Sequence, residues 1–167
     1  MSDPQTNTSQ KANDLADRII MGAVALEGYA EKLSTSDWQR KVAGDGRTIG
    51  VVVHHVASSY PVEIDLARLL ASGQPITGVT MEVVDQMNAK HAQENISVEK
   101  KETLELLRSN SKVAADSVRA FTDTELNQAA AVSLNADAPL TTQFFIEDHA
   151  LRHSFHHLAR IRATLNK

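Results

Sequence analysis

The chain has 167 residues, of which 42% are hydrophobic and 23% are charged, with a net charge of −4 and no cysteine. This length and composition fit one folded domain spanning 1–167, with enough apolar residues for a sizeable core. The negative charge argues against a nucleic-acid partner, since binding to phosphate backbones depends on cationic side chains. The lack of cysteine excludes disulfides, thiolate metal ligands and a cysteine nucleophile within this chain.

Nothing in the sequence predicts a membrane or export segment. No apolar run approaches the roughly 20 residues that a helix needs to span a bilayer. The start of the chain, MSDPQTNTSQKANDLADR, is polar and contains no apolar signal-peptide core. We therefore expect a cytoplasmic protein without a membrane partner.

Apolar residues recur at helical spacing in four long segments, and no segment shows the alternation typical of strands. The expected long helices cover 9–33, 48–73, 97–121 and 142–165. Thr48 is the expected N-cap of the second helix and Gly73 its stop, while Pro61 should kink or loosen it. A short helix is expected over 80–92, and a loop over 127–142. This pattern predicts an all-α protein, an antiparallel four-helix bundle.

Four of the seven histidines fall in the nine-residue segment HALRHSFHH near the C-terminus. At about 100° per residue, a helical wheel separates them into two pairs. His153 and His157 lie on one column that borders the core, whereas His149 and His156 lie farther around, toward arginines and solvent. The apolar stripe of this helix is predicted to be Phe144, Leu151, Phe155, Leu158 and Leu165.

In the second helix the two adjacent histidines also separate. The wheel places His54 on the polar side and His55 at the centre of the most apolar face, which also contains Val51, Val52, Val62, Leu66, Leu69 and Leu70. A buried imidazole must satisfy two ring nitrogens. A hydrogen bond to a serine, a carboxylate or a water would do so without any metal. Ser59, one turn further on the same face, is expected to bond back into its own helix.

Two imidazoles one turn apart can chelate an ion, and a third from a facing helix completes a set that leaves a position open. His55, His153 and His157 form such a set, and we expect His54, His149 and His156 to lie outside it. Because metal binding needs neutral imidazoles, occupancy should fall as the pH drops through about 6.5. His91 receives no role.

The segments TIGVVVHHVASS and HALRHSFHHLARIRATL, with the long separation between them, resemble the DinB family of DinB/YfiT-like metalloenzymes over nearly the whole chain. The resemblance implies a four-helix bundle, a homodimer, and a divalent metal, nickel or zinc, bound by His55, His153 and His157. Two positions depart from the family. Arg47 stands where the family often has a tryptophan, and Ala159 and Arg160 stand where it often has Gly-Gln.

Family members with assigned activities include thiol-dependent transferases and an isomerase, all using low-molecular-weight thiols. The resemblance therefore implies a metal-dependent transferase or hydrolase whose metal activates a bound thiol or water. Since the chain has no cysteine, the thiol would come from a small-molecule cosubstrate. The alternative is a noncatalytic helical binding or stress-associated protein whose metal is structural or adventitious.

Overall fold

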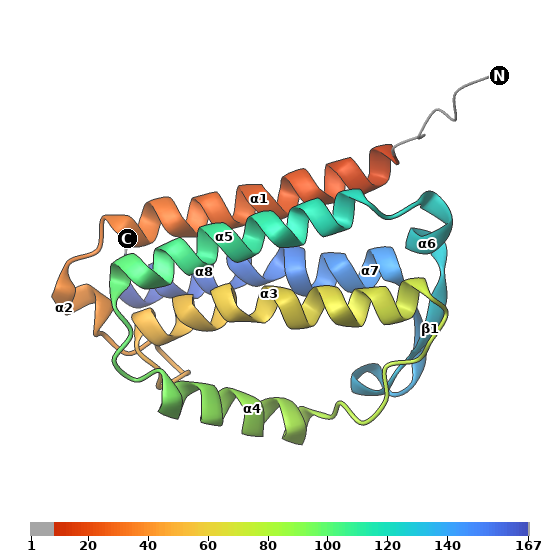
Figure 1. The fold of residues 1–167 in the computed structure, drawn as a ribbon. Coiled ribbons are helices and arrows are strands. Elements are labelled where there is room, and N and C mark those ends of the chain that lie inside the picture. The colour runs from red at the N-terminus through yellow and green to blue at the C-terminus, as the bar shows by residue number, and fades with distance from the viewer. Residues whose placement is uncertain (1–8, 167) are drawn as a thin grey trace.

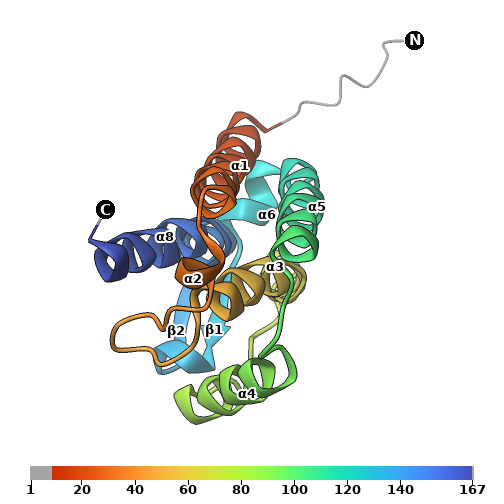
Figure 2. The ribbon, with the colours of Figure 1, turned by 90° about the vertical axis from the view of Figure 1, so that its left-hand side faces the viewer.

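The computed structural model describes residues 9–166, so the first eight residues of the polar start and the last residue lie outside the described part. Four long helical segments run side by side along one axis (Figure 1). They are α1 (Gln10–Glu31), α3 (Ile49–Ala71), α5 (Lys100–Arg119), and a C-terminal helix made of α7 (Thr142–Ile146), the π-helical turn η2 (Glu147–Leu151) and α8 (Arg152–Leu165). The end-on view shows these four around a common centre (Figure 2).

Short elements connect the long ones. They are α2 (Thr35–Trp38), α4 (Met81–Glu94), α6 (Asp123–Asn127), β1 (Ala129–Val132), the 3-10 turn η1 (Ser133–Asn135) and β2 (Ala138–Thr141). No helix in the described range is long and apolar enough to cross a membrane.

The predicted four-helix bundle is confirmed, but its chain path is not a plain up-and-down one. After α3, helix α4 carries the chain back along the outside of the bundle to the start of α5. The neighbouring helices α3 and α5 therefore run in the same direction (Figure 1). None of the residues of α4 is fully buried. The helix therefore lies against the bundle rather than inside it, below α3 in the end-on view (Figure 2).

Side-chain caps begin α1 and α3, and the cap of α3 is the Thr48 that the sequence predicts. The Ser9 hydroxyl accepts a hydrogen bond from the backbone N–H of Ala12 at 3.0 Å, and the Thr48 hydroxyl accepts one from Val51 at 3.3 Å. Each satisfies a first-turn donor that has no intrahelical partner. Gly73, just beyond α3, has a φ of 78°, a left-handed conformation that glycine adopts without steric cost.

Helix α3 continues through Pro61 because another helix supplies the missing donor. Proline has no N–H, so the carbonyl of Ala57, four residues earlier, loses its intrahelical partner. The Asn110 side chain of α5 donates to that carbonyl at 2.9 Å. The disturbance expected at Pro61 is thus confined to one hydrogen bond, which also ties α3 to α5.

The expected loop over 127–142 is instead a small antiparallel hairpin, in which Ala129 pairs with Thr141 and Val132 with Ala138. The sequence AAAV-SLN-ADAPLT lacks the alternation that predicts strands and has only one β-branched residue in each strand, Val132 and Thr141. Tertiary contacts supply the order. Ile76 donates its N–H to Ala131 and accepts one from Ser133, both at 2.9 Å, and the Ile76 and Val132 side chains are buried.

The core lies between the four long helices. Its largest fully buried side chains include Tyr60, Leu15, Ile19, Leu26, Ile49, Leu70, Leu107, Leu126, Ile146 and Ile161. Trp38 closes one end of the bundle: it is 4% exposed, and its indole N–H donates to the Val98 carbonyl at 3.1 Å. The indole lies so close to Gly50 that a Cβ there would be 2.5 Å from the indole nitrogen.

Candidate metal centre

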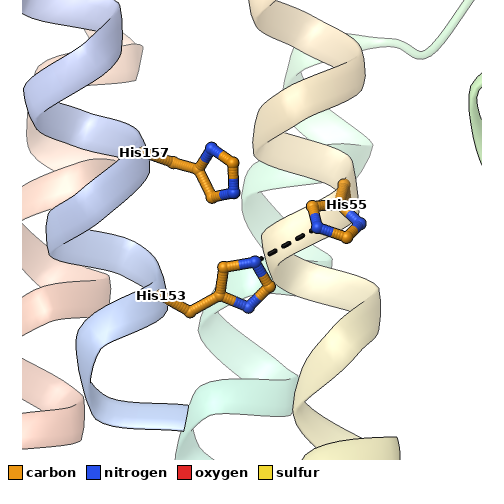
Figure 3. Close-up of side chains that lie close together, drawn as sticks. All are labelled: His55, His153 and His157. Atoms are coloured by element: carbon orange, nitrogen blue, oxygen red, sulfur yellow. Dashed lines mark hydrogen bonds between the residues drawn. The ribbon is translucent and has the colours of Figure 1, made fainter. Parts of the chain in front are cut away.

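Three imidazoles meet between α3 and α8. His55 comes from α3, and His153 and His157 come from successive turns of α8 (Figure 3). One ring nitrogen from each lies within 4.8 Å of those of the other two, and the Nε2 atoms of His55 and His153 are 3.1 Å apart. The structure thus brings together the three residues that the sequence predicts as ligands.

The spacing fits a small divalent ion. With metal–nitrogen distances of about 2.1 Å, two ligand nitrogens lie about 3.4 Å apart in a tetrahedral site and at most about 4.2 Å apart in any geometry. The 3.1 Å separation between His55 and His153 is close to the tetrahedral value. The widest separation that the cluster allows, 4.8 Å, exceeds the tetrahedral spacing by about 1.4 Å and the upper limit by about 0.6 Å, so binding an ion would draw the most distant pair of nitrogens together by up to that amount.

Burial keeps two of these imidazoles neutral, the form that binds metals. Desolvation, and next the nearby His153, lower the pKa of His55 to about 2. The same two causes, in the same order, lower the pKa of His157 to about 3. Protons therefore compete for these two nitrogens at much lower pH than the unperturbed value of about 6.5 indicates.

A carboxylate that the sequence analysis missed stands behind His153. The Glu63 Oε1 atom of α3 is 2.8 Å from His153 Nδ1, and their side chains are only 11% and 16% exposed. The oxygen is not aligned with the ring N–H as a hydrogen bond requires, yet its charge favours the proton on Nδ1. Nε2 then presents its lone pair to the other histidines. Such a carboxylate behind a ligating imidazole is a common feature of metal sites.

Neighbouring hydrogen bonds hold α3 and α8 in register around the three histidines. The hydroxyls of Tyr60 on α3 and Ser154 on α8 are 2.7 Å apart in the buried interface. Ser59, one turn after His55, donates to the His55 carbonyl at 2.7 Å, which confirms the bond back into its own helix. The ligand positions are therefore fixed by the bundle itself.

The wheel was only partly right about the surroundings of His55: Val51, Val52 and Leu70 of the predicted face are buried. The buried face of α3 runs through Val53, Val56, Tyr60 and Ile64, to one side of His55, which is half-buried. Val62 and Leu69, predicted to share its buried face, are 48% and 39% exposed. His55 therefore lies at the edge of the core, where a metal ligand can be reached from outside.

The π-helical turn explains the errors on the C-terminal helix. A π turn inserts one residue relative to an α-helix, which rotates the preceding residues by about 100° against the following ones. Phe144, predicted to be buried, is 47% exposed, while its neighbour Phe145 is 2% exposed. His149, predicted to face solvent, is half-buried against the Phe145 ring at 4.2 Å between centroids. The turn ends at Leu151, two residues before His153.

Phe155 lies beyond the π turn and is nevertheless 39% exposed, contrary to its predicted place in the apolar stripe. The buried face there runs through Ser154, His157, Leu158 and Ile161. The Phe155 ring packs closely over Gly22 of α1, where a Cβ would be only 2.9 Å from the ring.

The remaining histidines surround the three without joining them. His156 is exposed, as predicted. His54 is half-buried, and its Nδ1 is 2.9 Å from Nε2 of His91. The centroid of the His91 ring is in turn 5.5 Å from the centroid of the His55 ring. Helix α4 thus brings His91 next to the centre, a placement that no local sequence pattern indicates.

A protein-family model matches most of the chain. The model of the DinB superfamily matches residues 22–161, which include all three histidines. No curated protein gave a significant sequence match.

Solved structures share the fold at low sequence identity. YfiT from Bacillus subtilis, described as a probable metal-dependent hydrolase with an unusual four-helix bundle topology, has a TM-score of 0.76 at 17% identity, covering 99% of this chain and 92% of that one. The sibling lethal factor precursor DfsB has a TM-score of 0.73 at 15% identity over 95% and 96% of the two chains. The mycothiol-dependent maleylpyruvate isomerase has 0.67 at 10% over 90% and 60%.

Proposed function

This chain belongs to the DinB superfamily, and on that premise we propose that it is a metal-dependent enzyme whose divalent ion, nickel or zinc, is held by His55, His153 and His157. The observation that carries the proposal is the convergence of three imidazole nitrogens within 4.8 Å at the edge of the core. Three protein ligands leave at least one position for a substrate or water, as in catalytic rather than structural sites.

The reaction class that we propose is transfer or hydrolysis. A divalent ion favours the deprotonated form of a thiol or water that it binds, and so supplies a nucleophile near neutral pH. The chain's own residues keep the centre ready: burial keeps His55 and His157 neutral, and Glu63 orients His153 from behind. Because the chain contains no cysteine, a thiol would come from a small-molecule cosubstrate.

A thiol screen tests the enzymatic part of the proposal. Metal-loaded protein is incubated with low-molecular-weight thiols and an electrophilic acceptor, and consumption of the thiol is followed against His153→Ala protein. Turnover that needs both the metal and His153 is the expected result. Stoichiometric metal without turnover for any thiol or ester would favour the noncatalytic alternative.

Two further expectations accompany the proposal. We expect a homodimer, by analogy with the family, and sedimentation showing only monomer at high concentration would contradict it. We also expect a cytoplasmic location, which cell fractionation tests.

A further inference from the structure

A second group of charged side chains lies one helical turn from His157. Arg160 follows His157 by three residues on α8, about 4.5 Å along the helix. Its Nη1 atom is 3.2 Å from Asp45 Oδ2. Asp45 and Arg47 belong to the loop that leads into α3, so this contact joins that loop to the helix that carries two of the three histidines.

The Arg47 guanidinium is held in a fixed orientation. Its Nε and Nη2 atoms donate to the two oxygens of Asp45 at 2.6 and 2.8 Å. The side chains of Arg47 and Asp45 are only 16% and 6% exposed. The hydrogen bond from Arg47 is the main cause that lowers the Asp45 pKa to about 2, so the carboxylate is ionised and the pair is permanent near neutral pH.

One nitrogen of the Arg47 guanidinium forms no hydrogen bond within the described residues. The Nη1 atom of Arg47 is buried and has no hydrogen-bond acceptor among residues 9–166. A buried donor without a partner is costly, and a charged one more so. With two guanidinium groups and one carboxylate, the cluster of Arg47, Asp45 and Arg160 retains one positive charge.

The positive charge of Arg47 acts on the histidine centre. It contributes to lowering the pKa of His55, His157 and His91, although burial is the larger cause in each case. The geometry places it there as well: Asp45 holds Arg47 and also contacts Arg160, one helical turn after His157, so the cluster lies beside the histidine centre.

We propose that Arg47 binds the carboxylate of the small molecule that occupies the metal centre, through the buried Nη1 that Asp45 leaves unpaired. This assignment rests on the proposed function and adds the chemical class of the ligand: a compact anionic molecule, with its reacting group at the histidines and a carboxylate at Arg47.

A matched pair of thiols tests the assignment. Cobalt-loaded protein is titrated with 3-mercaptopropionate and with 3-mercaptopropionamide, which differ only in the carboxylate, and the thiolate-to-cobalt absorption band reports binding. Wild-type protein should bind the carboxylate at least about tenfold more tightly, the effect of one charge-assisted hydrogen bond. Arg47→Gln should reduce this preference to less than about twofold, whereas Arg160→Gln, the control at the more exposed partner of Asp45, should retain most of it.

Equal affinity of wild-type protein for the two thiols would overturn the assignment, whether or not Arg47→Gln folds. A preference that survives Arg47→Gln would also overturn it. If neither thiol gives a band, the proposed metal-thiol chemistry fails, and the two compounds are then titrated calorimetrically onto metal-free protein. A carboxylate preference lost in Arg47→Gln would still support the arginine site there, and its absence would refute it.

Discussion

Glu63→Gln should weaken metal binding without altering the three ligands. The carboxylate lies 2.8 Å from His153 Nδ1 and is nearly buried, which places its charge roughly 7 Å from an ion bound at Nε2. At an effective dielectric constant of about 20, a unit negative charge attracts a divalent ion at that distance by about 5 kcal/mol. Solvent and the intervening ring reduce this value, and outer carboxylates in metal sites typically contribute 10- to 100-fold in affinity, about 1.4 to 2.7 kcal/mol.

Competition with a chromophoric chelator at pH 7.5 measures this effect. Glutamine keeps the size of the side chain and removes its charge, so the fold should be retained, as circular dichroism can verify. Asp65→Asn is the matched control, because Asp65 lies on the same helix with a side chain 72% exposed and pairs with Arg68. A loss of less than about threefold in Glu63→Gln, or an equal loss in the control, would refute the role of Glu63.

Other predictions concern the fold around the centre. Metal-free protein should lose stability as the pH falls from 7 to 5. In the unfolded chain the histidines protonate near 6.5, whereas in the folded protein His55 and His157, with pKa values of about 2 and about 3, stay neutral. The free energy of unfolding should fall by about 2 kcal/mol for each of the two, and urea unfolding that shows no such decrease would contradict this account. Asn110→Ala should cost about 1 to 3 kcal/mol by leaving a buried carbonyl unpaired, and Pro61→Ala in that background should recover part of the loss; thermal unfolding that shows no coupling would exclude this explanation. Gly50→Ala should destabilise by about 1 to 3 kcal/mol through overpacking against Trp38, whereas Gly28→Ala, in open space on α1, should stabilise by about 0.4 to 1 kcal/mol; equal effects would contradict the packing argument.

Local sequence patterns were sufficient for the long helices and for the three histidines that the structure brings together. Helical spacing and caps such as Thr48 predict where helices begin and end, because these signals act within a few residues. The i, i+4 spacing of His153 and His157 likewise depends only on the helix that contains them. The helical wheel selected His55 although it misplaced Val62 and Leu69, and the family resemblance pointed to the same residue.

Features that depend on tertiary contacts were not predictable. The hairpin over 129–141 has poor strand sequences and is ordered by Ile76. The π turn has no sequence signal, so a regular wheel misplaced Phe144 and His149. Glu63 lies about 80° around the helix from His55, and only the position of α8 shows that it meets His153. His91 required knowledge of where α4 lies against the bundle.

Metal analysis of untagged protein with alanine variants tests the central claim most directly. Elemental analysis at pH 7.5 should give close to one divalent ion per chain in the wild type, and less than about a tenth of that in His55→Ala, His153→Ala and His157→Ala, because removal of one of three ligands leaves a weak two-histidine site. His54→Ala and His156→Ala should retain most of the metal. If His156→Ala empties the site while His157→Ala does not, or if the wild type binds no ion after incubation with nickel or zinc, the proposed centre is wrong.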